Sequence, residues 1–191
     1  DNLSIMERNT MRLLDLTNQL LDFRKTEAQG FQLNFMICDI SQLIKDTYIR
    51  FDPAAKQNDL TFKIGLPEQN FNAAVDKEAL TKILSNLFNN AVKYAKSYIH
   101  VSLHAPTDEQ NDFFSITVSN DGLPIPVEMK EKIFEPFVQI KNVSNGQTKT
   151  ETGIGLPLAR SLTELHRGKL YLKDSDDICF CIELPNKKKK T

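Results

Sequence analysis

The sequence predicts an α+β fold: a two-layer α/β sandwich, with helices on one face of a mixed sheet, preceded by one long helix. The first observation is an apolar repeat of seven residues that runs through the opening segment. The second is that the rest of the chain alternates between the helical period and the strand period. The third is the composition of the 191 residues, 40% hydrophobic and 26% charged, which suits one globular domain with an appendage.

Residues 1–29 predict a single long helix. Its seam recurs at heptad spacing and consists of Met6, Asn9, Leu13, Leu16, Leu20 and Phe23. Leu14 and Leu21 widen the apolar stripe, which favours a bundle over a two-stranded coil, and Gly30 is suited to end the helix. Because the helix cannot bury this stripe alone and the sequence has no second helix of this kind, we expect a partner helix to cover it.

The remaining chain predicts a series of strands and helices. Alternating apolar residues predict strands at about 33–37, 60–66, 98–104, 113–119, 168–173 and 178–184. Asp39 and Asp76 are suited to cap two helices, the second running to about Ala95; further helices fit 126–132 and 156–166. Residues 140–152 lack periodicity and predict a mobile loop. We therefore divide the chain into a helix at 1–29, a domain at 30–186 and a basic tail or linker at 187–191.

Charge and composition exclude several classes of function. The net charge of −1 provides no general field for a polyanion, so we expect no nucleic-acid partner. No apolar run reaches the length of a membrane span, and no signal peptide opens the chain. Cys38, Cys179 and Cys181 match neither a disulfide framework nor a zinc site, and we expect free thiols in the strands of a reduced cytosolic protein.

The predicted helix after Asp76 has two faces. Its core stripe consists of Leu80, Ile83, Leu84, Leu87 and Ala91. Asn86, Asn90 and Lys93 form a second stripe, which at about 100° per residue lies to one side of the core stripe. These residues could simply form a solvated surface. However, asparagine oxygens suit magnesium, which usually brings phosphate oxygens, and Lys93 could neutralise phosphate charge. Tyr94 falls between the stripes, where its ring could wall a pocket.

Three later segments carry weaker patterns. Residues 118–126 contain an Asn-Asp-Gly sequence, which on its own favours a simple turn. Residues 133–137 place two phenylalanines around a proline, and packing in the core could also explain this arrangement. Residues 153–158 place Gly-Ile-Gly before a helix, where backbone amides can approach a phosphate. Neither a Walker-type phosphate loop nor a dinucleotide fingerprint is present.

Taken together, the four segments resemble the signature boxes of the histidine-kinase catalytic domain. Residues 84–94 resemble the asparagine box, 118–126 the first glycine box, 133–137 the phenylalanine box and 153–158 the second glycine box. The opening helix resembles the second helix of the dimerisation stalk, with the first stalk helix absent. The resemblance implies a Bergerat-type ATP-binding fold and a sensor kinase of a two-component system, of either the simple or the hybrid type.

The resemblance also implies the roles of particular residues. ATP and Mg²⁺ would be the cofactors, with Asn90 as the metal ligand and Asn90 and Lys93 as the catalytic pair. The expected nucleotide-binding residues are Asn86, Asn90, Lys93, Tyr94, Asn120, Gly122, Ile125, Phe137, Lys141, Gly153, Ile154, Gly155 and Leu156. We also expect the loop at 140–152 to close over the phosphates, with Lys141 and Lys149 as candidates to reach the γ-phosphate.

Two departures from the family pattern affect the nucleotide boxes. Asn120 stands where the family has an aspartate that accepts a hydrogen bond from the adenine amino group; a carboxamide oxygen can still accept that bond, but without the charge. Pro124 and Glu151 each replace a box glycine. Both departures could lower the affinity for nucleotide, and they keep open the alternative of a degenerate nucleotide-sensing or dimerisation module.

A third departure is an expected absence. The family's phosphoacceptor histidine lies on the first stalk helix, and none of His100, His104 and His166 has that context. We therefore expect the chain to bind ATP and to transfer phosphate to a histidine outside it. The expected partners are the stalk helix with that histidine, a second copy joined through the stalk, and the receiver domain of a response regulator. The parent would be a membrane-bound sensor of which this is a cytoplasmic portion.

Another ATPase of the same superfamily is the remaining alternative. Topoisomerase, mismatch-repair and chaperone ATPases carry a glutamate one turn before the metal-binding asparagine, where it activates water. Asn86 occupies that place here, which argues against hydrolysis.

Overall fold

The computed structural model describes residues 2–28, 30–106, 112–140 and 153–186. Its centre is a five-stranded mixed sheet in the order β2-β4-β5-β7-β6, in which only β2 and β4 are parallel. The strands are β2 (Thr61–Gly65), β4 (Tyr98–His104), β5 (Phe113–Asn120), β6 (Lys169–Lys173) and β7 (Ile178–Pro185). A separate antiparallel pair consists of β1 (Met36–Asp39) and β3 (Asn72–Val75).

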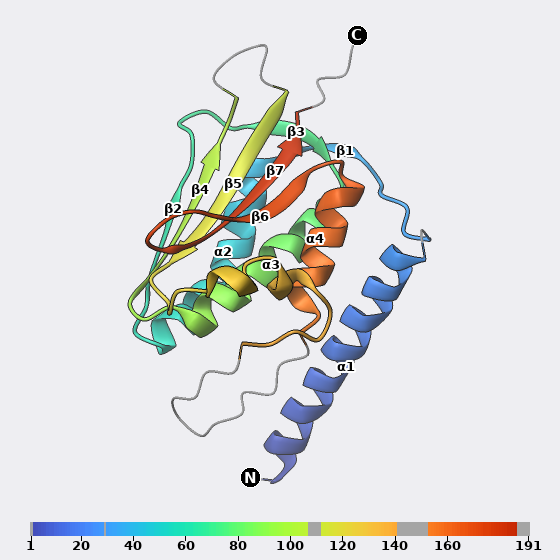
Figure 1. The fold of residues 1–191 in the computed structure, drawn as a ribbon, viewed down its shortest axis with the longest axis vertical. Coiled ribbons are helices and arrows are strands. Elements are labelled where there is room, and N and C mark those ends of the chain that lie inside the picture. Colours follow the sequence, from blue (N-terminus) through green and yellow to red (C-terminus); the bar gives the residue numbers. More distant parts are fainter. Residues whose placement is uncertain (1, 29, 107–111, 141–152, 187–191) are drawn as a thin grey trace.

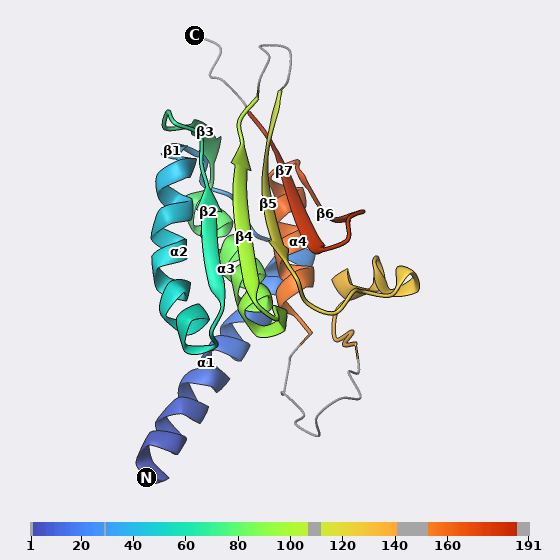
Figure 2. The same ribbon diagram turned by 90° about the vertical axis from the view of Figure 1, so that its left-hand side faces the viewer.

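Helices α2 (Ile40–Gln57), α3 (Lys77–Tyr94) and α4 (Gly155–Leu165) pack on one face of the sheet, as Figures 1 and 2 show from two sides. The strand pattern explains this arrangement. In β5, the residues Phe114, Ile116, Val118 and Asn120 are buried, while the intervening Ser115, Thr117 and Ser119 are more exposed. Since successive side chains of a strand point to opposite faces, the sheet has one apolar face under the helices and one polar face.

The predicted helix caps are present. The carboxylate of Asp39 accepts a hydrogen bond from the Gln42 amide at 3.0 Å, and that of Asp76 accepts one from the Ala79 amide at 2.9 Å. Each therefore satisfies one of the amide donors left free at a helix start. The predicted two-layer α+β fold is confirmed.

Two local predictions were wrong, and one strand was missed. The first strand covers Met36–Asp39 rather than 33–37, because β1 forms only where β3 lies beside it. The strand β3 itself was not predicted. The expected helix at 126–132 is two 3₁₀ turns, Val127–Met129 and Lys132–Phe134, which is the usual form of helical segments this short.

Helix α1 (Asn2–Glu27) extends away from the domain, and the contacts of its described side chains with the domain lie near its C-terminal end, on α4 and the first half of α3 (Figure 1). Phe23 is buried there, and Asp22 forms an ion pair with Lys82 of α3. Upstream, the expected apolar stripe is open: the exposed fractions of Leu13, Leu14 and Leu21 all exceed one half. Among the described residues, no helix is both long and apolar enough to cross a membrane.

Candidate functional site

Helix α3 places the expected carboxamide stripe beside the core. Leu80, Ile83, Leu84 and Leu87 are fully buried, as the core stripe predicts. Asn86, Asn90 and Lys93 are half-buried on the neighbouring face of the same helix. A helix fixed by its buried stripe therefore holds the polar stripe in a defined direction, where these side chains are neither enclosed in the core nor fully exposed.

The start of α4 lies against this stripe. A Cβ atom at Gly155 would stand 2.9 Å from Oδ1 of Asn86, so a larger residue there would displace the Asn86 carboxamide from its present position. The preceding Ile154 is buried and provides no side-chain cap to the helix, while Leu156 packs on the core. Among the residues that the structure describes, no side chain therefore caps the first amide groups of α4, which can donate hydrogen bonds to another partner beside the carboxamide of Asn86.

The loop after β5 meets the other end of α3. A Cβ atom at Gly122 would stand 2.6 Å from the Tyr94 carbonyl oxygen and 3.1 Å from Cδ1 of Ile178. The Gly122 amide donates to Oδ1 of Asn120 at 3.0 Å, and Asn120 is only 2% exposed. Ile125 follows and packs on the edge of the core. The first glycine box and the end of the asparagine box therefore form one junction.

Two expected residues flank this junction on α3. The ammonium of Lys93 lies 5.0 Å from the ring centroid of Tyr94, a cation–π distance. Tyr94 is 38% exposed, so its ring borders solvent rather than a closed pocket.

Phe137 and Gly153 form a third contact. The Phe137 amide donates to the Gly153 carbonyl at 2.9 Å, and Gly153 has a φ of +64°, which favours glycine. The Phe137 ring is 66% exposed, whereas Phe134 is buried with its ring 6.2 Å from that of Phe180. Lys141, Lys149 and the rest of the expected lid beyond Ile140 lie outside the described residues.

One residue of this region was missed by sequence reasoning. The carboxylate of Asp121 accepts hydrogen bonds from the backbone amides of Lys96, Ser97 and Tyr98 and from the Ser97 hydroxyl. Burial raises the pKa of Asp121, but the bonds from Ser97, Tyr98 and Lys96 outweigh it and hold that pKa well below its usual range. Asp121 thereby fixes the turn between α3 and β4 next to Gly122. Aspartate in an Asn-Asp-Gly turn often bonds nearby amides, but the sequence gives no sign that its partners lie more than 20 residues away.

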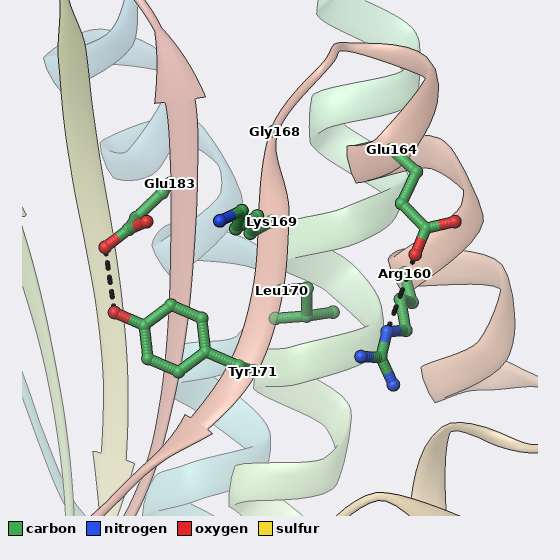
Figure 3. Close-up of a pocket in the computed structure, with 7 residues that line it drawn as sticks. All are labelled: Arg160, Glu164, Gly168, Lys169, Leu170, Tyr171 and Glu183. Carbon is green, nitrogen blue, oxygen red and sulfur yellow. Dashed lines mark hydrogen bonds and ion pairs between the residues drawn. The ribbon is translucent and has the colours of Figure 1, made fainter.

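A separate hollow of about 480 Å³ lies between α4 and the edge strand β6, and none of the expected site residues lines it. Figure 3 shows two pairs among its polar groups and Lys169 without a partner among the residues drawn: the Tyr171 hydroxyl donates to Glu183 at 2.8 Å, and Arg160 forms an ion pair with Glu164. Arg160 is further held by Glu131 at 2.9 Å. The hollow therefore offers little unpaired chemistry to a ligand.

The three histidines and three cysteines occupy structural positions. His100 and His104 lie in β4 on the polar face of the sheet, and His166 is buried at the end of α4. Nδ1 of His166 bonds the Leu162 carbonyl at 2.7 Å and Nε2 accepts from the Asp76 amide at 3.1 Å. All three cysteines lie in strands as free thiols, as predicted. Within the described part of the chain, no group of three or more His, Cys, Asp or Glu residues could hold a metal ion. The residues that could hold a metal here are instead Asn86 and Asn90, since carboxamide oxygens suit Mg²⁺ together with phosphate and water oxygens.

Comparison with known proteins agrees with this arrangement. Residues 75–188, more than half of the chain, match the family described as histidine kinase-, DNA gyrase B-, and HSP90-like ATPase. The sensor histidine kinase TmoS of Ectopseudomonas mendocina is 34% identical over 95% of this chain, which spans only 18% of TmoS.

Solved structures share the fold. Full-length ShkA in complex with AMPPNP superposes with a TM-score of 0.82 at 21% identity, covering 95% of this chain and 37% of that one. The histidine kinase ThkA in complex with the response regulator protein TrrA gives a TM-score of 0.72 at 21% identity, covering 98% and 51%. Three findings lead to one conclusion. The family match runs from the end of β3 onward, TmoS extends the similarity through α1, and the asparagine and glycine boxes meet in the structure. This chain belongs to the histidine kinase-, DNA gyrase B-, and HSP90-like ATPase family and contains the ATP-binding catalytic domain of a histidine kinase.

Proposed function

We propose that the chain binds Mg²⁺–ATP along α3 and transfers the γ-phosphoryl group to a histidine outside these 191 residues. The observation that carries the proposal is that one helix, α3, meets a glycine loop at each end of its polar stripe. Gly155 lies against Asn86, and Gly122 lies against the carbonyl of Tyr94. At about 1.5 Å per residue, the two contacts are on the order of 12 Å apart along the helix, which suits an elongated ligand.

The phosphates would lie at the start of α4. The helix dipole and the uncapped first amides favour an anion there, and Gly155 allows the backbone to come close. Lys93 would add positive charge. The base would lie at the junction of Asn120, Gly122 and Ile125, where buried side chains exclude water.

Asn90 would hold the metal, with Asn86 beside it. When bound, Mg²⁺ neutralises charge that develops on the phosphate oxygens during transfer. Asn86 cannot serve as a general base for water, because a carboxamide does not take up a proton at neutral pH. Transfer to a positioned acceptor is therefore favoured over ATP hydrolysis.

The acceptor would be supplied by another helix. His166 is buried and bonded through both ring nitrogens, and His100 and His104 lie on the face of the sheet opposite to α3. The open apolar stripe of α1 fits a helical partner, in a homodimeric stalk that also supplies the acceptor. The ThkA–TrrA complex supports a receiver domain as the next partner. We also propose a membrane-anchored parent that holds this part in the cytoplasm.

Calorimetric titration tests the binding proposal directly. ATP should bind more tightly with Mg²⁺ than with a chelator, and Asn90→Ala should remove that difference. Lys93→Ala should weaken ATP more than adenosine, because only ATP brings phosphate charge to the ammonium. Ser119→Ala, on the opposite face of the sheet, is the matched control and should bind as the wild type does. Equal Mg²⁺ dependence in wild type and Asn90→Ala would contradict the assigned metal ligand.

A further inference from the structure

We propose that Asn120 lets this site accept purine nucleotides with an oxygen at the purine C6 position, such as inosine or guanosine triphosphate, as well as ATP. The inference rests on the proposed function, in which the base lies at the junction of Asn120 and Gly122. It concerns the choice of base, which the proposed function leaves open.

The position of Asn120 is fixed by the sheet. It is the last residue of β5, and the alternation of that strand places it on the helix-covered face with Ile116 and Val118. It is 2% exposed. Besides the Asn120 oxygen itself, the groups nearest to a Cβ atom placed on the adjoining Gly122 are the Tyr94 carbonyl oxygen at 2.6 Å and Cδ1 of Ile178 at 3.1 Å.

The orientation of the carboxamide follows from its one side-chain hydrogen bond. The Gly122 amide is a donor, so the atom of Asn120 that faces it at 3.0 Å must be the oxygen. The amide nitrogen, with two hydrogens to donate, therefore points elsewhere. Within the described part of the chain, that nitrogen has no hydrogen-bond partner. Asn120 is almost fully buried as a residue, but no buried side-chain nitrogen or oxygen of the described residues lacks a partner, so this nitrogen lies where it can be reached from the surface. A donor of a buried residue that is open only at such a point indicates a place for an acceptor atom of a ligand.

The chemistry of aspartate and of asparagine at this position then decides which purine base the site accepts. A carboxylate at this position only accepts hydrogen bonds, so it suits the 6-amino group of adenine and repels a 6-oxo group. A carboxamide held by Gly122 can donate from its nitrogen to a 6-oxo group. Its oxygen keeps a second lone pair for a 6-amino donor. Asn120 therefore lacks the electrostatic penalty by which an aspartate would reject a 6-oxopurine.

The test is a comparison of ATP with inosine triphosphate, which replaces the 6-amino group by an oxygen, carries a hydrogen on N1 and has no 2-amino group. Titrations with Mg²⁺ would be run on the wild type, Asn120→Asp and the control Ser119→Ala. The aspartate keeps an acceptor for the Gly122 amide, so this variant should fold, and thermal unfolding would verify it. Guanosine triphosphate is a second probe that adds a 2-amino group.

For the wild type we expect dissociation constants for the two nucleotides within about tenfold of each other, and the same ratio for Ser119→Ala. Asn120→Asp should widen the ratio in favour of ATP by about tenfold or more, since a site left with unpaired or repelling polar groups discriminates strongly.

Two results would overturn the inference while leaving ATP binding intact. One is a wild type that rejects inosine triphosphate by more than about a hundredfold. The other is a ratio that does not change in Asn120→Asp, which would mean that Asn120 only closes the turn at Gly122. Failure of the folded wild type to bind either nucleotide would instead refute the proposed function, and the inference with it.

Discussion

At the scale of single residues, one carboxylate holds the junction on which the base site depends. Asp121 accepts bonds from three successive amides and one hydroxyl at the start of β4, directly after Asn120 in the chain. Its partners Lys96 and Ser97 follow the end of α3. Asp121 is thus a positioning residue, which keeps the end of α3 against the glycine loop.

We predict that Asp121→Ala lowers the free energy of unfolding by about 1–3 kcal/mol, because the amides lose their acceptor. ATP affinity should fall in the same variant. Asp121→Asn should recover only part of either loss, since its amide nitrogen would face the backbone donors. Asp176→Ala, an exposed aspartate in the β6–β7 turn, is the control. Denaturant unfolding and ATP titration measure both effects, and an ATP affinity that stays at the wild-type level in folded Asp121→Ala would contradict the positioning role.

His166 gives the domain a pH dependence. Burial lowers its pKa from the ordinary value of 6.5, and the bonds at Leu162 and the nearby Asp76 only partly oppose this. The unfolded chain therefore takes up a proton below about pH 6.5 while the folded chain stays neutral. By linkage, the free energy of unfolding decreases as pH falls from 6.5 toward the lowered pKa, and this contribution is constant at lower pH.

Replacing the ring should remove that dependence. His166→Gln keeps an acceptor for the Asp76 amide but does not titrate. The wild type should be more stable than the variant at about pH 7.5, and its advantage should shrink by about pH 5.5. Urea unfolding of both proteins at several pH values measures this. A stability difference that is independent of pH would show that His166 titrates normally in the folded state.

At the scale of elements, α1 combines a docked end with an open stripe. Phe23 and Thr26 are buried against the domain, and Lys82 joins Asp22 by an ion pair and lies 5.9 Å from the ring of Phe31. The upstream stripe has no such cover in the described part of the chain. The helix therefore depends on a few contacts for its docking.

We predict that Phe23→Ala releases the docked end of α1 and leaves the domain folded. Hydrogen exchange should increase over residues 16–27, while the amides of β5 and β7 keep their protection, because their bonds lie within the sheet. Leu13→Ala is the matched control, since Leu13 is 64% exposed and makes no comparable contact. Equal exchange in α1 of Phe23→Ala and wild type would show that other contacts hold the helix.

Elements with a regular apolar pattern could be predicted from the sequence. Elements that form only by pairing with a segment far away in the chain could not. The strand over 60–66 and the helix after Asp76 have clear periods and formed where expected. Residues 72–75 have small side chains and become a strand only because Ala73 pairs with Cys38. The 3₁₀ turns after Pro126 are too short for a helical period to specify them.

At the scale of the whole molecule, the candidate site depends on contacts between elements far apart in sequence. The residue types and their order along the chain predicted the boxes when the four segments were taken together, although each segment alone also suits a solvated surface, a turn or core packing. The closeness of Gly155 to Asn86 follows from the packing of α4 on α3, for which the local sequence carries no pattern. The same holds for Gly122 and the end of α3. The family match then agrees with the order of the boxes.

The central claim is that this chain carries the catalytic site and not the phosphate acceptor, and a labelling experiment tests it most directly. The chain would be incubated with Mg²⁺ and ATP labelled at the γ-phosphate, alone and with a stalk helix that contains the acceptor histidine. In-line transfer needs an acceptor within bonding reach, whereas His166 is buried and bonded through both ring nitrogens, and His100 and His104 lie on the sheet face opposite to α3. The account predicts no label on the chain alone and label on the added helix that resists base and is lost in acid. Stable labelling of residues 1–191 by themselves would contradict it.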